Sequence, residues 1–494
     1  MTTTETSPAS TEVRRRASEA ERAFSVTAAS SPETRVAWLQ AVADALDAHA
    51  DELVAVADRE TALGAGRLRG EVARTTGQLR LFADVVTEGS YLEAVIDHAV
   101  PSAAPPRPDL RRMLRPIGPV AVFAASNFPF AFSVAGGDTA SALAVGCPVI
   151  VKAHPGHPEL SRRTGSLVAS ALRGAGAPGG VFALVEGYEA GPALVDDPAI
   201  RAVAFTGSLA GGRALHDRAA RRPSPIPFFG ELGSLNPVVV TPGADAATGA
   251  RLAEELAGSF QLGAGQFCTK PGVVFVPEGS VLEEALPQHV GGGAAALLTP
   301  SIATGFDEGV RRLAATEGVS VVAGRLDALG PDAVADEGAR PVVLAVDAST
   351  LAERPDDILT EVFGPVTVLV RYTGDAGGDD LTHALDALEG SLTATLHAAP
   401  GEPVEPVLRR LETLAGRVLF EGWPTGVAVN WAQHHGGPWP ATTSAHTSVG
   451  ATAVRRFLRP IAYQSAPAGS LPEALRDDNP LRIPRRVDGE LVLP

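Results

Sequence analysis

Val120-Ala121-Val122-Phe123 and Val149-Ile150-Val151 are two short apolar runs separated by the helical stretch 134–145. A buried strand, a helix and a second buried strand in this order form a βαβ unit, in which the two strands are parallel. The alternation continues through Phe182-Ala183-Leu184-Val185 and Ala202-Val203-Ala204-Phe205. These runs predict a doubly wound, Rossmann-like α/β domain, whose ligands bind at the carboxyl ends of the strands.

The sequence on either side of these runs extends this domain and predicts a second one. Ser31-Pro32-Glu33 has a capping hydroxyl, an early proline and an acid in the first turn, as a helix start does. Apolar residues then recur mostly every three or four positions through 36–53 and 68–86, which predicts two helices with buried faces. Downstream, strands are expected at 238–240, 273–276, 319–322, 342–344, 366–370 and 418–420, with helices at 252–260, 310–315, 381–388 and 407–414. This second alternation predicts a second α/β domain.

Composition and charge exclude several classes of function. The 494 residues are 45% hydrophobic and 20% charged, which is typical of a globular protein with two or three domains. The net charge of −16 argues against a nucleic-acid or anionic membrane partner, since both attract clustered Lys and Arg. No apolar run is long enough to span a membrane, and segment 1–12 lacks the features of a secretory signal. With two cysteines in all, no disulfide framework is expected and the cytoplasm is the expected location.

The turn Gly265-Gln266-Phe267-Cys268-Thr269-Lys270 contains one of the two cysteines. Most of its neighbours are polar or small rather than aliphatic, so Cys268 is expected on a partly open turn, where a thiolate can act as a nucleophile. The alternative is a small buried hydrophobic residue, which is the common environment of a free cysteine. The other cysteine, Cys147, precedes a buried strand and is expected in the core.

Three further motifs carry candidate functional side chains. Phe229-Gly230-Glu231-Leu232-Gly233 places a carboxylate among glycines and apolar residues, where its pKa rises and it can act as a base. Thr360-Glu361-Val362-Phe363-Gly364-Pro365 leads into the expected strand 366–370. Ser126-Asn127-Phe128-Pro129-Phe130 follows the strand that ends at Phe123, at the ligand-binding edge of the sheet, although a turn-capping asparagine is the alternative.

These motifs, in this order, resemble the aldehyde dehydrogenase superfamily over 30–465. The wording Gly-Glu-Leu-Gly-Ser-Leu-Asn-Pro at 230–237, Gly-Gln-Phe-Cys-Thr-Lys-Pro-Gly at 265–272 and Gly-Gly-Pro-Trp-Pro-Ala-Thr-Thr at 436–443 resembles the branch that oxidises 2-oxoglutarate semialdehyde (2,5-dioxovalerate). The resemblance implies an NAD(P)-dependent aldehyde dehydrogenase with a small-molecule aldehyde as its substrate. Aliphatic (fatty) aldehydes are the alternative substrates.

The resemblance also implies catalytic roles. Cys268 would add to the aldehyde and carry a thioester, while its own N–H and the amide of Asn127 would stabilise the oxyanion. Glu231 would activate the water that releases the acid. No catalytic metal is expected, because the adjacent His434 and His435 would point to opposite faces of an extended backbone and make a poor metal pair.

The stretch 205–212, Phe-Thr-Gly-Ser-Leu-Ala-Gly-Gly, connects an expected strand to a helix. It leaves backbone N–H groups and the positive helix end free for a pyrophosphate, although a structural tight turn is the alternative. The residues expected to bind the cofactor are Lys152, His154, Phe205, Thr206, Gly207, Ser208, Arg213, Glu361 and Phe363; for Glu361 the alternative is a surface glutamate. Pro155 stands where many NAD-using relatives have an acid that binds the ribose 2′-hydroxyl. NADP is therefore expected over NAD, with Arg213 and His154 near the 2′-phosphate.

Substrate-binding residues are expected on the helix that contains Thr75-Thr76-Gly77-Gln78-Leu79-Arg80, which in such proteins lines the substrate funnel. Arg80 would pair with the distal carboxylate of an oxo-acid semialdehyde, with Gln78 and Phe130 nearby. A solvated helix face is the alternative for Arg80. Segment 436–443 resembles the loop that closes the funnel, and an ordinary surface loop is the alternative.

The expected domain organisation follows the same resemblance. Segment 1–12 is expected to be a disordered lead. The NAD(P)-binding domain would comprise 13–100 and 117–228, the catalytic domain with Cys268 would comprise 229–435, and 101–116 and 455–494 would form an antiparallel oligomerisation flap and tail. The flap implies a homodimer or a homotetramer.

Two other classes of function are compatible with parts of the sequence. A cysteine hydrolase or acyltransferase would use Cys268 with a distant histidine, but would leave the cofactor motifs without a use. A non-catalytic member of the fold would lack Cys268 or Glu231, and both are present. Growth of the reduced-nicotinamide absorbance on mixing the protein, NADP and an aldehyde separates the three functions.

Overall fold

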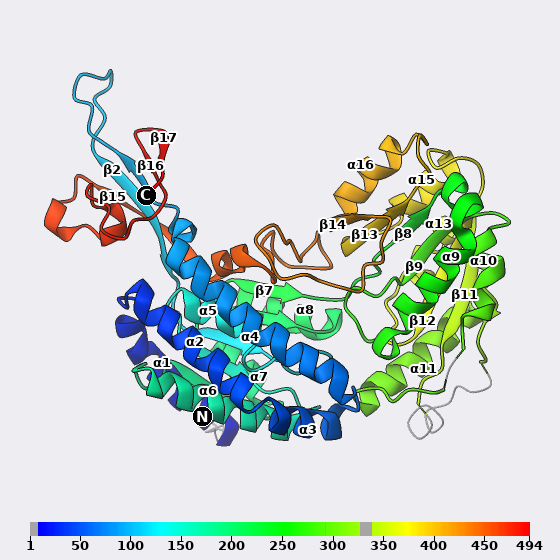
Figure 1. The fold of residues 1–494 in the computed structure, drawn as a ribbon, viewed down its shortest axis with the longest axis horizontal. Coiled ribbons are helices and arrows are strands. Elements are labelled where there is room, and N and C mark those ends of the chain that lie inside the picture. Colours follow the sequence, from blue (N-terminus) through cyan, green and yellow to red (C-terminus); the bar gives the residue numbers. More distant parts are fainter. Residues whose placement is uncertain (1–7, 292, 327–337) are drawn as a thin grey trace.

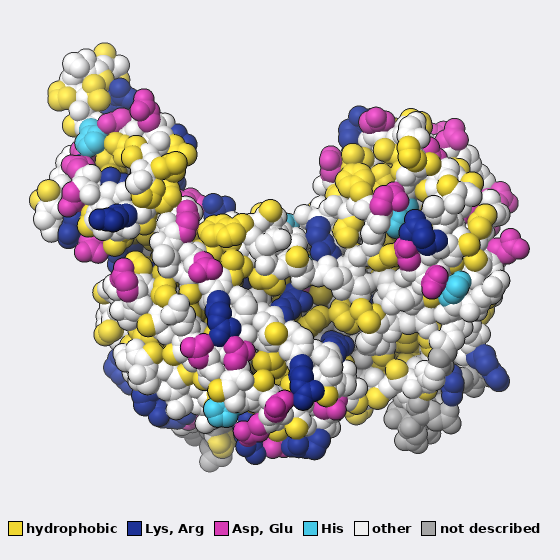
Figure 2. All heavy atoms as spheres, in the orientation of Figure 1, with side chains coloured by type: hydrophobic (Ala, Val, Ile, Leu, Met, Phe, Trp, Pro, Cys, Tyr) yellow, Lys and Arg dark blue, Asp and Glu magenta, His cyan; other side chains and the backbone are white. Residues whose placement is uncertain are grey.

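The chain folds into two α/β domains and a projecting sheet (Figure 1). This computed structural model describes residues 8–291, 293–326 and 338–494. On the face drawn in Figure 2, the molecule is hollowed between the two domains. Within the described ranges, no helix is long and apolar enough to cross a membrane.

The first domain is built on parallel strands in the order β5 (Phe182–Val185), β4 (Val149–Lys152), β3 (Val120–Phe123), β6 (Ala202–Thr206) and β7 (Phe228–Glu231). Successive side chains of a strand point to opposite faces of the sheet, so Val122 packs in the core on one face and Phe123 in the core on the other. Both faces are covered by helices, which is why the strands are apolar throughout. The predicted Rossmann-like alternation is confirmed.

Helices cover each face of this sheet. One face carries α2 (Pro32–Ala48), α3 (Ala50–Thr61), α4 (Ala65–Glu88), α5 (Gly137–Ala144) and α6 (Pro158–Gly174), and the other carries α1 (Pro8–Thr27), α7 (Ala190–Asp196) and α8 (Leu209–Ala220). Ser31 caps α2 as predicted, because its Oγ accepts a hydrogen bond from Thr34 N at 3.3 Å. The expectation of a disordered lead over 1–12 is wrong for 8–12, which belong to α1, and 1–7 lie outside the described residues.

The second domain contains a mostly parallel sheet in the order β10 (Ser320–Ala323), β11 (Val342–Asp347), β12 (Val366–Tyr372), β9 (Val273–Pro277), β8 (Val238–Val240), β13 (Ser391–His397) and β14 (Ala415–Phe420). Only the β10–β11 pair is antiparallel among these described strands. One face packs on α9 (Pro242–Gln261) and α10 (Val281–Ala285), and the other on α11 (Pro300–Ala315), α13 (Ala348–Glu353), α14 (Pro355–Ile358), α15 (Asp379–Asp386) and α16 (Glu405–Leu414).

The projecting sheet joins two segments that are far apart in the sequence. Its order is β15 (Leu458–Gln464), β2 (Leu110–Pro116), β1 (Val95–Asp97), β16 (Arg485–Val487) and β17 (Glu490–Val492). β2 and β15 are antiparallel over their whole length, from Leu110 opposite Gln464 to Pro116 opposite Leu458. The sheet stands away from the first domain in Figure 1.

The boundary between the domains differs from the expected one at Glu231. This residue ends β7 and pairs with Thr206 of β6, so it belongs to the first sheet, whereas the sequence placed 229–435 in the second domain. An isolated antiparallel bridge joins Glu231 to Thr442 of the returning chain. Glu231 and Cys268 therefore come from different domains.

Candidate active site

A cavity of about 850 Å³ lies between the two domains. First-domain residues at the carboxyl ends of β3, β4, β6 and β7 line one side, as expected for a doubly wound sheet. The second domain contributes Cys268, the start of α11 and the segment that precedes β12. The lining residues are Ala125, Ser126, Asn127, His154, Pro155, Gly156, Thr206, Gly207, Ser208, Glu231, Leu232, Cys268, Leu298, Thr299, Pro300, Ser301, Ile302, Gly305, Phe306, Glu361 and Phe363.

The Cys268 turn is fixed by backbone contacts and by buried polar side chains. Gly265 has φ +67°, and a Cβ on it would lie 2.2 Å from the carbonyl oxygen of Gly364, so only glycine fits here. Asn236 Nδ2 donates to the Cys268 carbonyl oxygen at 2.8 Å. Lys270 Nζ donates to Val362 O and Val366 O at 2.8 Å each. The turn is thereby attached to the segment that carries Glu361 and Phe363.

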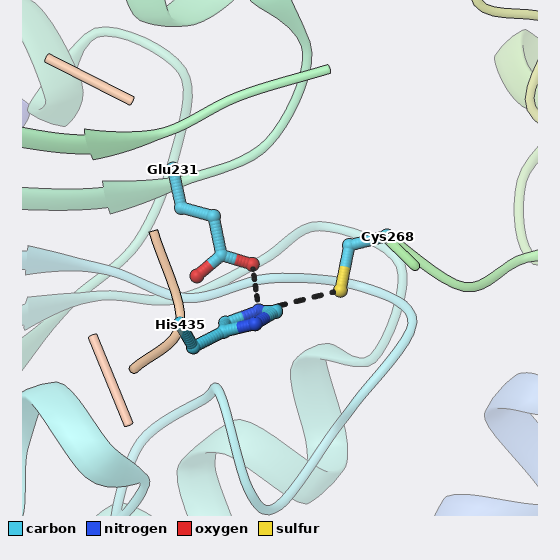
Figure 3. Close-up of side chains that lie close together, drawn as sticks. All are labelled: Glu231, Cys268 and His435. Atoms are coloured by element: carbon cyan, nitrogen blue, oxygen red, sulfur yellow. Dashed lines mark hydrogen bonds and ion pairs between the residues drawn. The ribbon is translucent and has the colours of Figure 1, made fainter. Parts of the chain in front are cut away.

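Cys268, Glu231 and His435 meet at the cavity wall (Figure 3). His435 Nε2 lies 2.9 Å from Glu231 Oε1 and 3.7 Å from Cys268 Sγ. Ser448 Oγ donates to the other carboxylate oxygen of Glu231 at 2.6 Å. Glu231 and His435 are buried, whereas Cys268 is half-buried. The predicted nucleophile and base are therefore together, with a histidine between them.

Burial and neighbouring charges set the protonation of this group. Burial raises the pKa of the Cys268 thiol well above its usual value, and the charge and hydrogen bond of Glu231 raise it further. Burial would also raise the pKa of Glu231, but His435, Ser448 and Cys268 together hold that pKa below its usual value. In the free protein Glu231 is thus a carboxylate beside a neutral thiol, in contrast to the raised pKa expected from its apolar neighbours.

Asn127 also lines the cavity, beside the cysteine turn. Its side-chain Nδ2 donates to Gln266 O at 3.0 Å, and its backbone carbonyl oxygen accepts from Arg67 Nη2 at 2.6 Å. An amide nitrogen carries two hydrogens, so one donor of Asn127 is left for a ligand. This position suits the oxyanion role implied by the resemblance.

Most of the expected cofactor residues line the cavity: His154, Thr206, Gly207, Ser208, Glu361 and Phe363. Ser208 caps α8 through a 3.3 Å hydrogen bond from Gly211 N to its Oγ, so the positive end of α8 faces the cavity. Burial lowers the pKa of His154 to about 3, and His154 is therefore neutral. An anionic dinucleotide fits this helix end and the volume of the cavity.

Lys152, Phe205 and Arg213 do not line the cavity. Lys152 is half-buried at the end of β4, where burial lowers its pKa. Phe205 packs between Phe123 and Phe228, with ring centroids 5.9 Å away in both cases, and its ring fills the space that a Cβ on Gly207 would need. Phe205 thus shapes the turn instead of touching a ligand.

Arg213 needs a further correction. Its side chain is 57% exposed, its Nε donates to Asp217 Oδ1 at 2.9 Å, and its guanidinium lies 5.3 Å from the centroid of Trp439. It lies four residues into α8, on the outer surface, so the structure does not place it in a phosphate pocket.

The three expected substrate residues are also misplaced. Arg80 is exposed and pairs with Asp44 and Asp47 at 2.8 Å each, on the surface between α2 and α4. Gln78 is buried against Gly137 of α5, and Phe130 is buried in the first-domain core. None of the three lines the cavity.

Two arginines that the sequence analysis missed lie on α4 near the thiol. Arg67 stacks on Phe128 and Phe267, with distances of 5.3 and 4.8 Å to the ring centroids, and Arg74 stacks on Phe128 and Phe132 at 5.6 and 5.5 Å. The charge of Arg74 is close enough to Cys268 to favour its thiolate. We call Arg67, Arg74, Phe128, Phe132 and Phe267 the arginine–phenylalanine cluster. Arg67 and Arg74 are seven residues apart, which is about two helical turns. This spacing was the available signal that both side chains lie on the same face of the helix.

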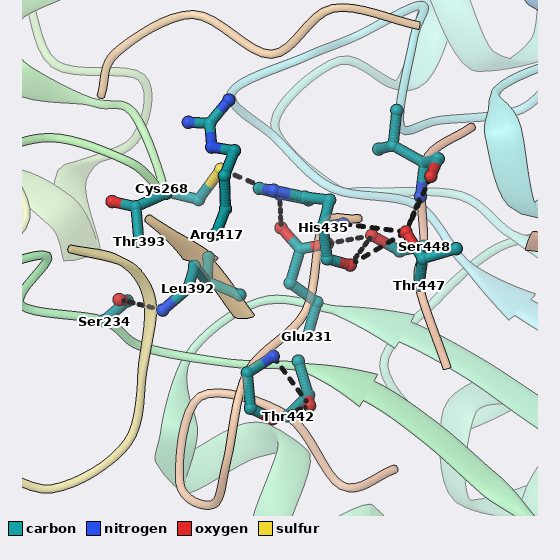
Figure 4. Close-up of polar contacts among 12 residues, drawn as sticks. Glu231, Ser234, Cys268, Leu392, Thr393, Arg417, His435, Thr442, Thr447 and Ser448 are labelled. Carbon is teal, nitrogen blue, oxygen red and sulfur yellow. Dashed lines mark hydrogen bonds and ion pairs between the residues drawn. The ribbon is translucent and has the colours of Figure 1, made fainter. Parts of the chain in front are cut away.

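His435 was considered only as half of a metal pair, and its approach to Cys268 depends on the chain returning to the first domain. His435 N donates to Thr447 Oγ1 at 2.7 Å, in the network of Figure 4. Arg417, also drawn there, is half-buried and acts electrostatically on Cys268. Within the described part of the chain, Glu231, Cys268 and His435 are a set of three side chains whose ligand atoms could hold a metal ion.

Comparisons with known proteins identify the family. The sequence matches the description "Aldehyde dehydrogenase family" over residues 2–438. The alpha-ketoglutaric semialdehyde dehydrogenase 2 of Azospirillum brasilense is 46% identical over 497 residues, which cover 98% of this chain and 92% of that protein. The alpha-ketoglutaric semialdehyde dehydrogenase of Acinetobacter baylyi is 40% identical, over 97% of this chain and 91% of that protein.

Solved structures give the same fold. The 1-pyrroline-5-carboxylate dehydrogenase from Thermus, with bound NAD, superposes with a TM-score of 0.75 at 22% identity, over 92% of this chain and 85% of that one. The aldehyde dehydrogenase C of Pseudomonas syringae, with NAD⁺ and octanal, gives a TM-score of 0.74 at 23% identity, over 93% and 90%. The resemblance seen in the sequence is confirmed, and the chain belongs to the aldehyde dehydrogenase family as an NAD(P)-dependent aldehyde dehydrogenase.

Proposed function

We propose that this enzyme oxidises an aldehyde that carries a distal carboxylate, with 2-oxoglutarate semialdehyde as the first choice, and that it prefers NADP. The observation that supports an anionic substrate is the arginine–phenylalanine cluster. Arg67 Nη1 and Arg74 Nε and Nη2 are buried without a hydrogen-bond partner among the described residues. Buried guanidinium groups are costly unless an anion pairs with them.

The one carboxylate between these arginines on α4, that of Glu71, is hydrogen-bonded through Oε1, while its Oε2 is buried without a partner among the described residues. Glu71 Oε1 accepts hydrogen bonds from Phe130 N at 2.8 Å and from Ala131 N at 3.0 Å. Burial raises the pKa of Glu71 to about 7, so its charge only partly offsets the two arginines at neutral pH. A substrate carboxylate would supply the missing charge, and a guanidinium fork could bind it through two hydrogen bonds.

The relatives support the identity of the anion. The two proteins at 46% and 40% identity are both named as alpha-ketoglutaric semialdehyde dehydrogenases. Their substrate is a five-carbon chain with an aldehyde at one end and a 2-oxo acid at the other. Arg74 does not line the cavity, but its charge acts on Cys268, and the carboxylate of a substrate whose aldehyde carbon is at Cys268 would pair with it.

The residues around Cys268 account for the chemistry of oxidation. Cys268 Sγ adds to the carbonyl carbon as the thiolate, once its proton has left to solvent, and the oxyanion accepts hydrogen bonds from Cys268 N and Asn127 Nδ2. NAD(P), when bound, accepts the hydride, which leaves a thioester on Cys268. Glu231, whose lowered pKa keeps it ionised, then takes a proton from the water that attacks the thioester. The products are the carboxylic acid and the free thiol.

The preference for NADP rests on the loop after β4. Pro155 lines the cavity where a carboxylate would repel a 2′-phosphate, and Lys152 lies at the end of the same strand. Arg213 no longer supports this preference, because Asp217 and Trp439 hold its guanidinium outside the cavity.

A neutral aliphatic aldehyde is the second candidate substrate, because three phenylalanines adjoin the thiol. Phe128 packs edge-on against Phe132 and Phe267, with centroids 5.4 and 5.3 Å apart. An alkyl chain would gain from contact with these rings. The unpaired arginines favour the anionic substrate over this one.

Catalytic efficiency on 2-oxoglutarate semialdehyde and on hexanal decides between the two substrates. Wild type should prefer the semialdehyde, and Arg74→Leu should lower kcat/KM for it by about ten- to a hundredfold, since a charge-assisted hydrogen bond contributes about 1.5–3 kcal/mol. Hexanal oxidation should fall less, because it loses only the support that Arg74 gives to the Cys268 thiolate. Arg80→Leu, on the exposed side of the same helix, is the matched control and should leave both values unchanged. A wild-type preference for hexanal would overturn the substrate proposal.

A further inference from the structure

The side chains of Cys268, His435 and Glu231 lie close together, and all three are of types that bind zinc. His435 Nε2 lies 3.7 Å from Cys268 Sγ and 2.9 Å from Glu231 Oε1, and the ligand atoms of all three residues lie within 4.8 Å of one another. They come from three separate segments, namely the end of β7, the cysteine turn and the chain that returns from the second domain. The oxidation described above uses Cys268 and Glu231. It assigns no role to His435.

We propose that Cys268, His435 and Glu231 form a site for Zn²⁺, through which the ion reversibly blocks the nucleophile. A thiolate, an imidazole and a carboxylate are the ligand types of zinc, and three protein ligands with one open position are common in zinc sites. The fourth position would face the cavity, which Cys268 and Glu231 line. This zinc would inhibit the enzyme. It is therefore distinct from a catalytic metal, which the sequence analysis does not expect.

Two of the three distances between ligand atoms are close to those around a tetrahedral ion, and the third, between Cys268 Sγ and Glu231, is within 4.8 Å. With Zn–S of about 2.3 Å and Zn–N or Zn–O of about 2.0–2.2 Å, ligand atoms around zinc lie about 3.3–3.7 Å apart. The 3.7 Å between sulfur and Nε2 already matches, while the 2.9 Å between Nε2 and Oε1 has to widen by a few tenths of an ångström. Mg²⁺ and Ca²⁺ require oxygen ligands and do not fit this set.

The surroundings orient two of the ligands. Ser448 Oγ donates to Glu231 Oε2 at 2.6 Å and leaves Oε1 free to turn to the ion. The backbone of His435 is held by Thr447 Oγ1 and Ser448 N, at 2.7 and 2.8 Å. The ring nitrogen Nδ1 of His435 is buried without a partner among the described residues, although metal-bound histidines usually donate from this second nitrogen. We therefore expect binding that is weaker than in structural zinc sites and readily reversed.

Binding balances as a ligand exchange. The Cys268 thiol loses its proton to solvent as the S–Zn bond forms, and His435 binds the ion through the lone pair of Nε2. Nothing is oxidised or reduced. An aldehyde cannot add to Cys268 while zinc holds its sulfur, so zinc should compete with the aldehyde.

The test is direct binding of Zn²⁺ to the full-length chain, measured by competition with a chromophoric chelator. Wild type should bind one Zn²⁺ per chain, Cys268→Ala should abolish this binding, and His435→Gln should weaken it at least about tenfold. Cys147→Ala is the matched control, because it removes the other cysteine, which is buried away from the cavity, and it should bind as wild type does. A folded Cys268→Ala or His435→Gln protein with wild-type affinity would overturn the proposal.

Measurements on wild type alone keep the proposal testable if His435→Gln does not fold. Co²⁺ in place of Zn²⁺ should give a thiolate-to-cobalt charge-transfer band, and Zn²⁺ should protect Cys268 from alkylation by iodoacetamide until EDTA is added. Dehydrogenase activity should fall with Zn²⁺, recover with EDTA and be insensitive to Mg²⁺. Absence of the charge-transfer band, or alkylation of Cys268 at the same rate with saturating Zn²⁺, would overturn it.

Discussion

Glu231 interacts with several catalytic-site groups at once, and its environment decides which step it serves. One carboxylate oxygen faces His435 and the other accepts from Ser448, while its charge raises the pKa of the Cys268 thiol. A carboxylate with a lowered pKa stays ionised over the physiological range, so it is ready to accept a proton. The same charge keeps the free thiol protonated.

The first prediction concerns release of the acid. Glu231→Gln should retain a burst of one reduced cofactor per site and lower steady-state turnover at least about a hundredfold, because only thioester hydrolysis needs the base in each cycle. Rapid mixing with absorbance of the reduced nicotinamide measures both phases. If the burst disappears as well, Glu231 is required to deprotonate Cys268.

The second prediction concerns the pH dependence of the thiol. Because burial and Glu231 raise the pKa of Cys268, the rate of alkylation by iodoacetamide in the free protein should still increase above pH 9. Glu231→Gln removes the negative charge that raises this pKa, so the curve should move to lower pH and alkylation at pH 8 should be faster. Cys147 is an internal control, because burial raises its pKa to about 11 and it should stay unmodified. An unchanged curve in Glu231→Gln would contradict the proposed coupling.

At the scale of elements, the ends of strands determine what the cavity can bind. The loop after β4 presents His154, Pro155 and Gly156 to the cavity, and the N-terminus of α8 presents Ser208. Burial lowers the pKa of His154 to about 3, which leaves the N-terminus of α8 as the group lining the cavity here that attracts an anion.

The third prediction follows from the loop after β4. Pro155→Glu should lower kcat/KM for NADP about tenfold or more and affect NAD much less, because a carboxylate repels the 2′-phosphate and can bind a 2′-hydroxyl. Steady-state kinetics with both cofactors at one aldehyde concentration measure the ratio. Pro155→Gln, which has similar volume and no charge, is the control. Equal losses with both cofactors would place the 2′ position elsewhere.

Periodicity explains which elements the sequence could predict. β3 and β4 are apolar runs with helices on both sides, and both were placed correctly. β13 was missed, although it is central to the second sheet, because Thr393 and Thr395 interrupt its apolar run; both are buried. The two β-branched threonines, alternating with Leu392, Ala394 and Leu396, were the available signal for a strand.

The arginine–phenylalanine cluster shows why some residues near the thiol could not be predicted. On α4, successive residues turn by about 100°, so Arg74 and Arg80 point to different sides, and only tertiary packing shows which side faces Cys268. The same holds for His435, which lies 167 positions from Cys268 in the sequence and reaches it through the returning chain. Cys268, Glu231 and Asn127 were found because family motifs, and not periodicity, identify them.

At the scale of the whole molecule, the projecting sheet has the properties of an association surface. Leu491 and Leu493 are 63% and 68% exposed near the C-terminus, beside the short hairpin of β16 and β17. Figure 2 shows hydrophobic side chains gathered on this part of the molecule. Exposed apolar residues on a projecting sheet edge favour pairing with another chain.

The fourth prediction is that this sheet joins subunits. Wild type should have the mass of a dimer or tetramer in solution, and Leu491→Asp combined with Leu493→Asp should shift it to a smaller species, because burying two charges at an interface is costly. Light scattering after size exclusion measures the mass. Val26→Asp, at another exposed apolar position, is the control and should not change it. A monomeric wild type would contradict the flap interpretation.

Nucleophile and base belong to opposite halves of the molecule, Cys268 beyond α9 in the second domain and Glu231 at the end of β7 in the first. Their alignment therefore depends on the interface between the two domains, each of which has its own hydrophobic core. If warming opens this interface, Cys268 Sγ moves away from the Glu231 carboxylate while each domain core is still folded. We therefore expect this enzyme to lose activity at a temperature below that at which either domain unfolds.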